Sequence, residues 1–334
     1  MGDEAFTWRD GGRTVVFRAG SLADATQILA QQGFESYELV STGRALESAG
    51  RLAEAASAVH QVAPGGVPDA AAAFLDAVGS ERLVAFGGGR VIDAAKAVAA
   101  VTGAEVAALP TTMSGAEMTG IHRLPAGAEE RARGLVRPQL ILADPELMTS
   151  QPEPALRASS MNALGHGADS LYTPFANPVS RMVALRGAKL ISVSLDAEEA
   201  ERDGAALALG SILCGYAIDS GLFALHHVVC QTLVRVCGSP HAETNAAILP
   251  RAMAAMRPRA PGQIEALAGA LDSTAERIEE RIAELGRPAG LGAAGADRSQ
   301  LEAALDAIEA RPELQFTPRP PDREELREII ESAW

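Results

Sequence analysis

Four of the six histidines of this chain lie in apolar segments of its second half. They are His166 in residues 161–166, His226 and His227 in residues 225–231, and His241 in residues 239–245. Asn162 lies four residues before His166, so in a helix the two side chains share one face. A single histidine on an apolar face is usually a satisfied core residue, whereas several in helical segments indicate a shared polar pocket. Such a pocket could donate hydrogen bonds and move protons.

A glycine-rich segment, residues 86–96, joins an apolar strand to an Ala-rich helix. Gly87, Gly88 and Gly89 let a phosphate approach the backbone closely, and the first amides of the helix lack partners within it. We therefore predict that the pyrophosphate of a dinucleotide binds here, with Asp93 in the same cofactor site. For a glycine run taken alone, a tight turn without a ligand is the alternative.

A second polar loop, residues 109–119, follows the next predicted strand and carries Thr111, Thr112 and Ser114. Ligands of open α/β sheets collect at the carboxyl ends of the strands, so we predict that these hydroxyls bind the cofactor, although they also suit an ordinary turn. Thr42 follows another predicted strand, where a ribose could sit. No acidic residue occurs in residues 41–44, so the sequence does not choose between NADH and NADPH.

The elements that must position these residues fall into two groups. Apolar runs alternate with Ala-rich helical stretches up to about residue 145; they are residues 14–17, 37–40, 83–86, 106–109 and 139–142. This pattern predicts a Rossmann-like α/β domain with a parallel sheet. Beyond Pro152 the segments have helical periodicity and no convincing strand. We expect a dinucleotide-binding domain over residues 1–150 and an all-helical substrate and catalytic domain over residues 151–334.

The composition indicates which kinds of molecule the protein binds. The formal charge of -14 and the pI near 4.9 argue against nucleic acid and anionic membranes, which attract clustered Lys and Arg. We therefore expect a small-molecule substrate. The acidic, polar start and the lack of a span-length apolar run predict a cytoplasmic protein. Cys214, Cys230 and Cys237 form no paired motif, so we expect reduced, buried thiols without chemistry.

Taken together, these stretches resemble the iron-containing alcohol dehydrogenase family over nearly the whole chain. The likeness lies in the glycine loop of residues 87–96, the Pro-Thr-Thr loop of residues 110–117, Asp-Pro-Glu-Leu at 144–147, the helix with His166, and Pro-His-Ala at 240–242. Residues 161–164, 225–227 and 240–244 are most similar to the maleylacetate reductase branch. The resemblance implies a dehydroquinate synthase-like fold, a homodimer, and the reduction of maleylacetate to 3-oxoadipate by NADH or NADPH in aromatic-compound degradation.

The resemblance also says where a metal would bind in metal-dependent relatives. Their ligands fall on Asn162, His166, His227 and His241, and the first of them is Asp in those relatives. Asn is neutral and a poorer ligand, although three histidines could still hold zinc. Because the reductase branch also carries Asn there and is described as metal-independent, we expect no functional metal.

Three further positions depart from the family pattern. Arg90 replaces a Ser of the glycine loop, Ala116 replaces a Ser of the cofactor loop, and Gln231 replaces a His. Our leading hypothesis is hydride transfer from NAD(P)H to a small activated enone or ketone, with an enolate stabilised by His166, His227 and His241 as catalytic residues. Arg123 or Arg131 could pair with a substrate carboxylate. A metal-dependent alcohol dehydrogenase, a non-redox enzyme and a ligand-binding member of the fold stay open as alternatives.

Overall fold

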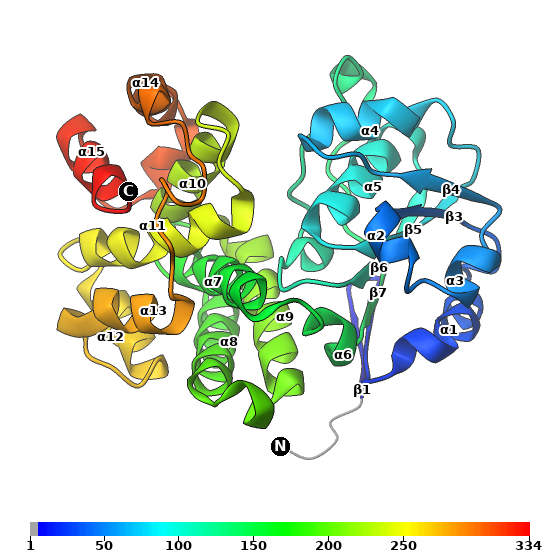
Figure 1. Cartoon of the computed structure of the whole chain (residues 1–334), viewed down its shortest axis with the longest axis horizontal. Helices are drawn as coiled ribbons and strands as arrows, with labels where there is room; N and C mark the ends of the chain where they lie inside the picture. The colour runs from blue at the N-terminus through cyan, green and yellow to red at the C-terminus, as the bar shows by residue number, and fades with distance from the viewer. Residues whose placement is uncertain (1–5) are drawn as a thin grey trace. The chain divides into compact units, whose positions relative to one another are not determined.

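The structure, a computed structural model, describes the backbone of residues 6–334 and the side chains of residues 11–334. The polar start of the chain at residues 1–5 lies outside the described part. The chain divides into two compact units, Met1–Gln151 and Pro152–Trp334. The first contains the sheet, and the second, which is described throughout, contains helices and no strand (Figure 1).

The first unit is a seven-stranded sheet in the order β1-β2-β7-β6-β5-β3-β4. All pairings are parallel except that between β1 and β2, which form an antiparallel hairpin. The strands are β1 (Phe6–Asp10), β2 (Arg13–Phe17), β3 (Glu38–Ser41), β4 (Ala58–Gln61), β5 (Arg82–Gly87), β6 (Glu105–Pro110) and β7 (Leu140–Ala143). The five predicted strands are thus confirmed to within one residue at each end. Strands β1 and β4, which lie at the two edges of the sheet, were not predicted from the sequence.

Helices cover both faces of this sheet. They are α1 (Ala25–Gln31), α2 (Gly43–Leu46), α3 (Arg51–Glu54), α4 (Val67–Leu75), α5 (Gly89–Thr102) and α6 (Pro145–Met148). Along β5, Leu83 and Ala85 pack in the core that includes α4 and α5, whereas Val84 and Phe86 pack in the core that includes α1 and α3. Because side chains alternate along a strand, an almost continuous apolar run is what a sheet covered on both faces requires.

The second unit packs its helices around α7, most of whose residues are buried. Its helices are α7 (Glu153–Ser170), α8 (Pro178–Asp196), α9 (Gly204–Gly221), α10 (Leu225–Val236), α11 (His241–Met256), α12 (Pro261–Ala270), α13 (Ile278–Gly286), α14 (Leu301–Glu309) and α15 (Arg323–Glu331). Helices α8 and α9 approach closely because glycines meet: a Cβ on Gly210 would lie 2.9 Å from the Gly187 carbonyl oxygen.

Among the described residues, one helix, α9, is long and apolar enough by composition to cross a membrane, but 61% of it is buried inside the protein. Its apolar character follows from its contacts with α7 and α8. Cys214 on this helix is buried, and burial raises the pKa of its thiol to about 12. All three cysteines are free and buried, as the sequence predicted, so they stay as neutral apolar side chains.

Candidate active site

The glycine loop lies where strand β5 ends and helix α5 begins. Gly88 is the N-cap of α5, and no side chain caps this end of the helix. A Cβ on Gly87 would lie 2.7 Å from Val91 Cγ2, and one on Gly89 would lie 2.9 Å from Ser114 Cβ. The segment therefore has no room for side chains, and its first amides keep their donor capacity. This is the arrangement in which a helix N-terminus accepts an anion.

The second polar loop lies against the first, because β5 and β6 are neighbours in the sheet. A Cβ on Gly88 would lie 3.0 Å from Thr112 Cγ2, and the Thr111 amide donates to the Gly87 carbonyl at 3.1 Å. The Thr112 hydroxyl is buried and has no hydrogen-bond partner among the described residues. Thr111, Thr112 and Ser114 thus border the glycine loop, and Thr112 holds a donor that a ligand could satisfy.

Two other predicted cofactor residues already have protein partners. The Asp93 carboxylate accepts from Lys96 Nζ at 2.8 Å, and Lys96 is fully buried and also donates to the carbonyls of Ala116 and Ile121. Thr42 follows β3, and its hydroxyl accepts from the Ala45 amide at 3.2 Å as the N-cap of α2. Both residues are thus held in place by local hydrogen bonds. Because β3 lies beside β5, Thr42 is at the same sheet edge as the glycine loop.

The predicted histidines come together in the second unit. His166 on α7 and His227 on α10 stack with their ring centres 4.7 Å apart. His241 is the exposed first residue of α11 and interacts electrostatically with His166. Burial, and then repulsion from His227 and His241, lower the pKa of His166 well below 6.5, so its ring is neutral. Asn162 is buried one turn before His166 on α7.

A carboxylate that the sequence analysis did not single out organises this cluster. Asp169 on α7 is fully buried and accepts hydrogen bonds from the backbone amides of Ala224 at 3.2 Å and His227 at 3.1 Å. These amides belong to the start of α10, whose own N-cap residue, Ala224, has no side-chain oxygen. Asp169 therefore caps α10 from a neighbouring helix, which also favours its negative charge. Tyr172 donates its hydroxyl to the same carboxylate.

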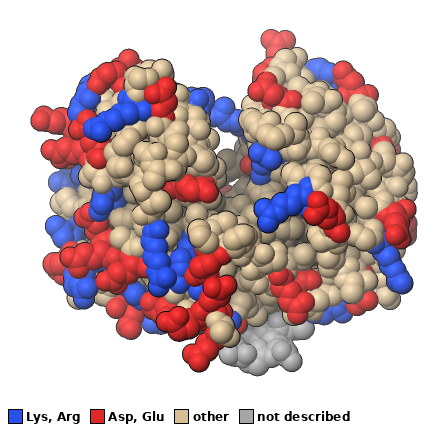
Figure 2. All heavy atoms as spheres, in the orientation of Figure 1, with Lys and Arg blue, Asp and Glu red and all other residues tan. Residues whose placement is uncertain are grey.

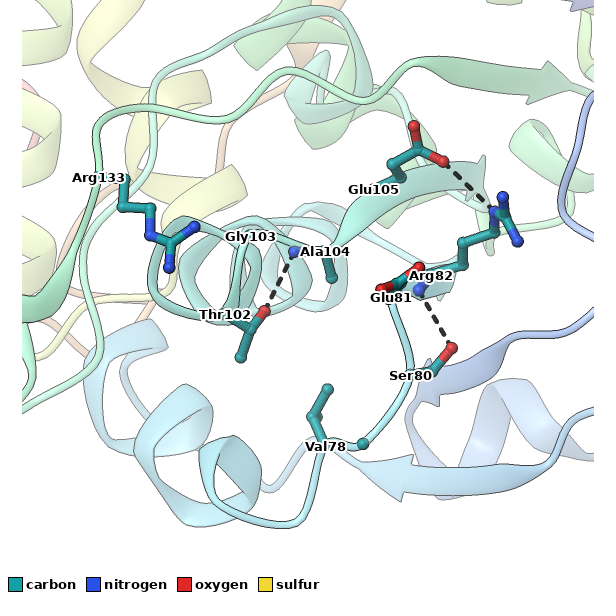
Figure 3. A pocket seen from close by; sticks show the side chains of 10 residues that line it. Val78, Ser80, Glu81, Arg82, Thr102, Gly103, Ala104, Glu105 and Arg133 are labelled. Carbon is teal, nitrogen blue, oxygen red and sulfur yellow. Dashed lines mark hydrogen bonds and ion pairs between the residues drawn. The ribbon is translucent and has the colours of Figure 1, made fainter.

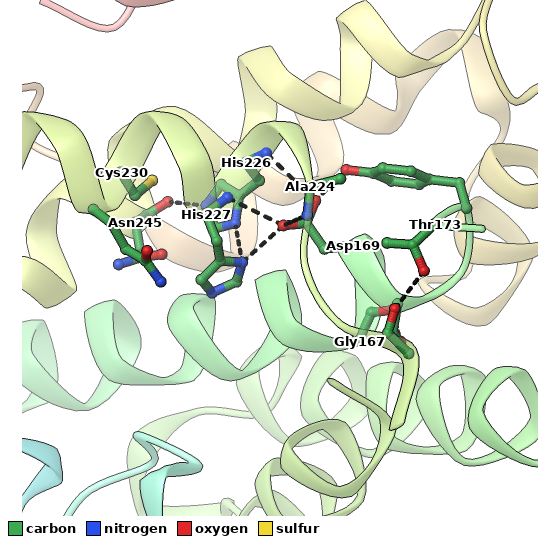
Figure 4. A network of polar contacts seen from close by, with 12 residues as sticks. Gly167, Asp169, Thr173, Ala224, His226, His227, Cys230 and Asn245 are labelled. Atoms are coloured by element: carbon green, nitrogen blue, oxygen red, sulfur yellow. Dashed lines mark hydrogen bonds and ion pairs between the residues drawn. The ribbon is translucent and has the colours of Figure 1, made fainter. Parts of the chain in front are cut away.

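The same carboxylate determines which nitrogen of His227 carries hydrogen. His226 Nε2 lies 3.3 Å from the Asn245 carbonyl oxygen, which can only accept, so the hydrogen of this neutral ring is on Nε2. His227 Nδ1 then faces two acceptors, Asp169 Oδ2 at 2.9 Å and His226 Nδ1 at 3.2 Å (Figure 4). Neutral His227 consequently carries its hydrogen on Nδ1 and a lone pair on Nε2. That Nε2 is buried and has no partner among the described residues.

The ionisation of Asp169 agrees with this assignment. Burial by itself would raise its pKa, but hydrogen bonds from His227 and Tyr172, together with the electrostatic effect of the His227 and His226 side chains, lower it below the ordinary range of an Asp. The carboxylate is therefore negative and can compensate a positive charge on the ring of His227. Burial also lowers the pKa of His226 to about 3, so that ring stays neutral.

Known proteins identify the family to which this fold and these residues belong. Residues 12–145 match the family described as iron-containing alcohol dehydrogenase, and residues 157–334 match the C-terminal part of the Fe-containing alcohol dehydrogenase family. The chain belongs to the iron-containing alcohol dehydrogenase family. A maleylacetate reductase from Burkholderia cepacia is 34% identical over 96% of this chain and 95% of its own length. Maleylacetate reductase 1 from Rhodococcus opacus is 33% identical over 80% and 77%.

Solved structures agree with the architecture of this family member. The maleylacetate reductase from Rhizobium sp. strain MTP-10005 superposes with a TM-score of 0.82, at 27% identity over 99% of this chain and 98% of the other. An iron-containing alcohol dehydrogenase from Corynebacterium glutamicum gives 0.83 at 26% identity over 100% and 97%. The chain is thus an NAD(P)-dependent oxidoreductase with the dehydroquinate synthase-like fold of its family.

The positions at which the resemblance would place a metal, Asn162, His166, His227 and His241, offer no carboxylate. They comprise the amide of Asn162 and three imidazoles. A neighbouring carboxylate, Asp169, already accepts from three backbone amides, from Tyr172 and from the His227 ring. Atoms of Asp169, His226 and His227 lie within 4.8 Å of one another, close enough for a metal ion, but their hydrogen bonds account for that spacing. The donor set therefore does not fit a site that relies on an Asp ligand for a divalent cation.

The departures from the family pattern have different surroundings. Arg90 is exposed in the first turn of α5, and Ala116 is buried near the glycine loop, with its Cβ 3.7 Å from a Cβ built on Gly89. Gln231 on α10 accepts from Arg311 Nη1 at 2.9 Å.

The arginines considered for a substrate carboxylate lie in the first unit, where Arg131 is exposed and 3.8 Å from Asp76. Neither Arg123 nor Arg131 belongs to the histidine cluster.

A cavity of about 540 Å³ opens in the first unit, at the start of strands β5 and β6, whose other ends carry the glycine loop and the second polar loop (Figure 3). It is lined by Arg82 and Glu105, the first residues of β5 and β6, and by Arg133. This is the amino-terminal edge of the parallel strands, whereas ligands of such sheets bind at the carboxyl-terminal edge. We assign no function to it.

Proposed function

We propose that this chain reduces maleylacetate, or a closely similar unsaturated keto acid, with NADH or NADPH as the hydride donor. The observation that carries the proposal is the buried pair of His227 and Asp169 beside His166. The support from known proteins is that maleylacetate reductases match almost the full length of the chain. The proposal includes a role in the breakdown of aromatic compounds.

The chemistry requires a hydride and a proton. Hydride passes from the reduced nicotinamide to one carbon of the activated double bond, and the electrons of that bond move onto the conjugated carbonyl oxygen as an enolate. Hydrogen bonds from the histidine cluster stabilise this oxygen, and the neighbouring carbon takes a proton. His227 is our proton donor because Asp169 compensates the charge of its protonated ring. His166 and His241 complete the catalytic set.

We further propose that the reaction needs no metal ion. Asn162 supplies no negative charge, and Asp169 is occupied by other donors, so the histidines act through hydrogen bonds and proton transfer. In the first unit, Gly87, Gly88 and Gly89 would hold the pyrophosphate, with Thr111, Thr112, Ser114, Asp93 and Thr42 around the rest of the cofactor.

The proposal also covers the cellular location, the oligomeric state and the binding partners of the enzyme. We infer a cytoplasmic homodimer that acts on a small carboxylate and binds neither nucleic acid nor membrane. On the face shown in Figure 2, basic side chains are interspersed with acidic ones and form no continuous basic surface among the described residues. This charge distribution supports a small-molecule substrate over a polyanion.

The test is an assay with purified protein, maleylacetate and either nicotinamide cofactor, following the loss of reduced nicotinamide by absorbance. We expect turnover that survives exhaustive chelation. His241→Ala should lower kcat at least about tenfold, because general acid–base groups and oxyanion donors contribute that much or more. Since His241 is exposed, the melting temperature of this variant should barely differ from that of wild type. An inactive wild type that still binds NADH, or activity lost on chelation and restored by iron, would contradict the proposal.

A further inference from the structure

The positively charged guanidinium of Arg311 lies beside α10, the helix that carries His227. Gln231 lies four residues after His227 on this helix, so the two side chains share one face, with Cβ atoms about 6 Å apart. The amide oxygen of Gln231 accepts from Nη1 of Arg311 at 2.9 Å. Arg311 comes from the segment between α14 and the short helix Pro312–Phe316, about 80 residues along the chain. The fold thus delivers a guanidinium to the face that carries His227.

An aromatic ring links the same guanidinium to His227. The guanidinium carbon of Arg311 lies 5.6 Å from the centre of the Phe223 ring, and that ring lies 6.1 Å from the centre of His227. The Arg311 side chain is only 14% exposed. It is therefore held by Phe223 and Gln231 rather than extended into water, and little side-chain entropy would be lost when it binds a ligand.

One edge of the Arg311 guanidinium is paired with the carboxylate of Glu313. Glu313 accepts from Nε at 3.1 Å and lies 3.1 Å from Nη2, so it occupies one edge of the guanidinium. Burial opposes the ionisation of Glu313, but the hydrogen bond from Arg311 lowers its pKa, so Glu313 is a carboxylate. Three of the five N–H groups of Arg311 have partners here, which leaves two for a ligand.

We propose that Arg311 binds a carboxylate of the substrate through its remaining N–H groups and holds the reacting carbons beside His227. A planar guanidinium with partners on its other edge is suited to a carboxylate, because its remaining donors are fixed in one plane. The inference rests on the proposed function and specifies its substrate class, an acid whose carboxylate lies a few bonds from the reduced double bond.

Three variants of the full-length protein test the assignment. Arg311→Met removes both the charge and the planar set of N–H donors. Arg311→Lys keeps the charge but loses the planar arrangement of donors. Arg259→Met is the matched control, because Arg259 is 10% exposed and pairs with Glu325 elsewhere in the same unit. For each variant, the dissociation constant of NADH is measured by fluorescence, and kcat and KM for maleylacetate by absorbance. Binding of glutarate and of dimethyl glutarate to the NADH complex is measured by thermal shift.

We expect Arg311→Met to raise KM about tenfold to a hundredfold, as befits a lost charge-assisted hydrogen bond, with NADH binding unchanged. Arg311→Lys should fall between this variant and wild type, and it decides the question if Arg311→Met does not fold. Glutarate, but not its ester, should stabilise wild type and Arg259→Met and leave Arg311→Met unaffected.

Each other outcome is decisive. An unchanged KM and unchanged glutarate binding in Arg311→Met would overturn the carboxylate site, and so would an equal loss in Arg259→Met, since that indicates a structural effect. Glutarate binding that depends on Arg311 in a protein unable to reduce maleylacetate would support the site and overturn the proposed function.

Discussion

Asp169 connects the stability of the helical unit to the chemistry of His227. Its two oxygens accept from backbone amides at the start of α10, from Tyr172 and from His227 Nδ1. In Asp169→Asn one oxygen becomes an NH₂ group that faces donors, and the compensating charge is lost. We expect the free energy of unfolding to fall by about 1–3 kcal/mol and kcat to fall at least about tenfold, with NADH affinity unchanged. Urea unfolding and steady-state kinetics measure the two effects.

Ser170→Ala is the matched control for this residue. Ser170 is the next residue of α7, is equally buried, and donates only to the Gly167 carbonyl at 2.8 Å among its described contacts. Its replacement should cost about 1 kcal/mol or less and leave kcat unchanged. If Asp169→Asn kept the turnover of wild type, Asp169 would be a helix cap without a part in positioning His227.

At the scale of elements, the positions of His226 and His227 depend on the close approach of α7 to α10 at Gly165. A Cβ on Gly165 would lie 2.3 Å from Cε1 and 2.6 Å from Nδ1 of His226, and 3.3 Å from Cε1 of His227. His226 cannot move away without losing its hydrogen bond to the Asn245 carbonyl. Gly165→Ala should therefore destabilise the protein by about 1–3 kcal/mol despite the better helix propensity of Ala, and it should also lower kcat.

Gly269→Ala on α12 is the control for that substitution. No atom lies within 4 Å of a Cβ built there, and the residue is exposed. It should be neutral or stabilise the protein by up to about 1 kcal/mol, as Ala normally does in a helix. Thermal unfolding of the two variants, compared with wild type, measures both changes. Equal melting temperatures would mean that the α7–α10 contact yields to the added methyl group.

At the scale of the whole molecule, one buried carboxyl should make the stability depend on pH near neutrality. Glu117 is fully buried, and neither of its oxygens has a hydrogen-bond partner among the described residues. Burial raises its pKa from 4.5 to about 7, although the charge of Lys96 opposes the shift. Because the folded-state pKa is the higher one, the stabilisation is complete below pH 4.5 and is lost as the pH rises through 7.

Glu117→Gln should remove this dependence, since an amide stays neutral at every pH. We expect the variant to match wild type near pH 4 and to be more stable by about 3 kcal/mol near pH 8.5, from 1.36 kcal/mol per pKa unit. Urea unfolding at the two pH values provides the comparison. Glu105→Gln, at an exposed carboxylate that pairs with Arg82, should show no such difference. A constant gap between Glu117→Gln and wild type across this range would refute the shifted pKa.

The sequence by itself was sufficient wherever local pattern decides structure. The apolar runs of the central strands, the glycines before α5 and the spacing of Asn162 and His166 depend on periodicity, backbone freedom and helix geometry within a few residues. The edge strands β1 and β4 escaped detection because an edge strand need not be apolar on both faces; Val59 in β4 is exposed. The roles of the cofactor loops and histidines stay predictions.

Only the tertiary structure decided which polar groups meet. Asp169 and His227 are 58 residues apart, His226 and the Asn245 carbonyl 19, and Arg311 and Gln231 80. No local periodicity links such pairs, because a buried donor finds whichever acceptor the packing of α7, α10 and α11 leaves within reach. The hydrogen on Nδ1 of His227, the lone pair on its Nε2 and the place of Arg311 all follow from those long-range contacts.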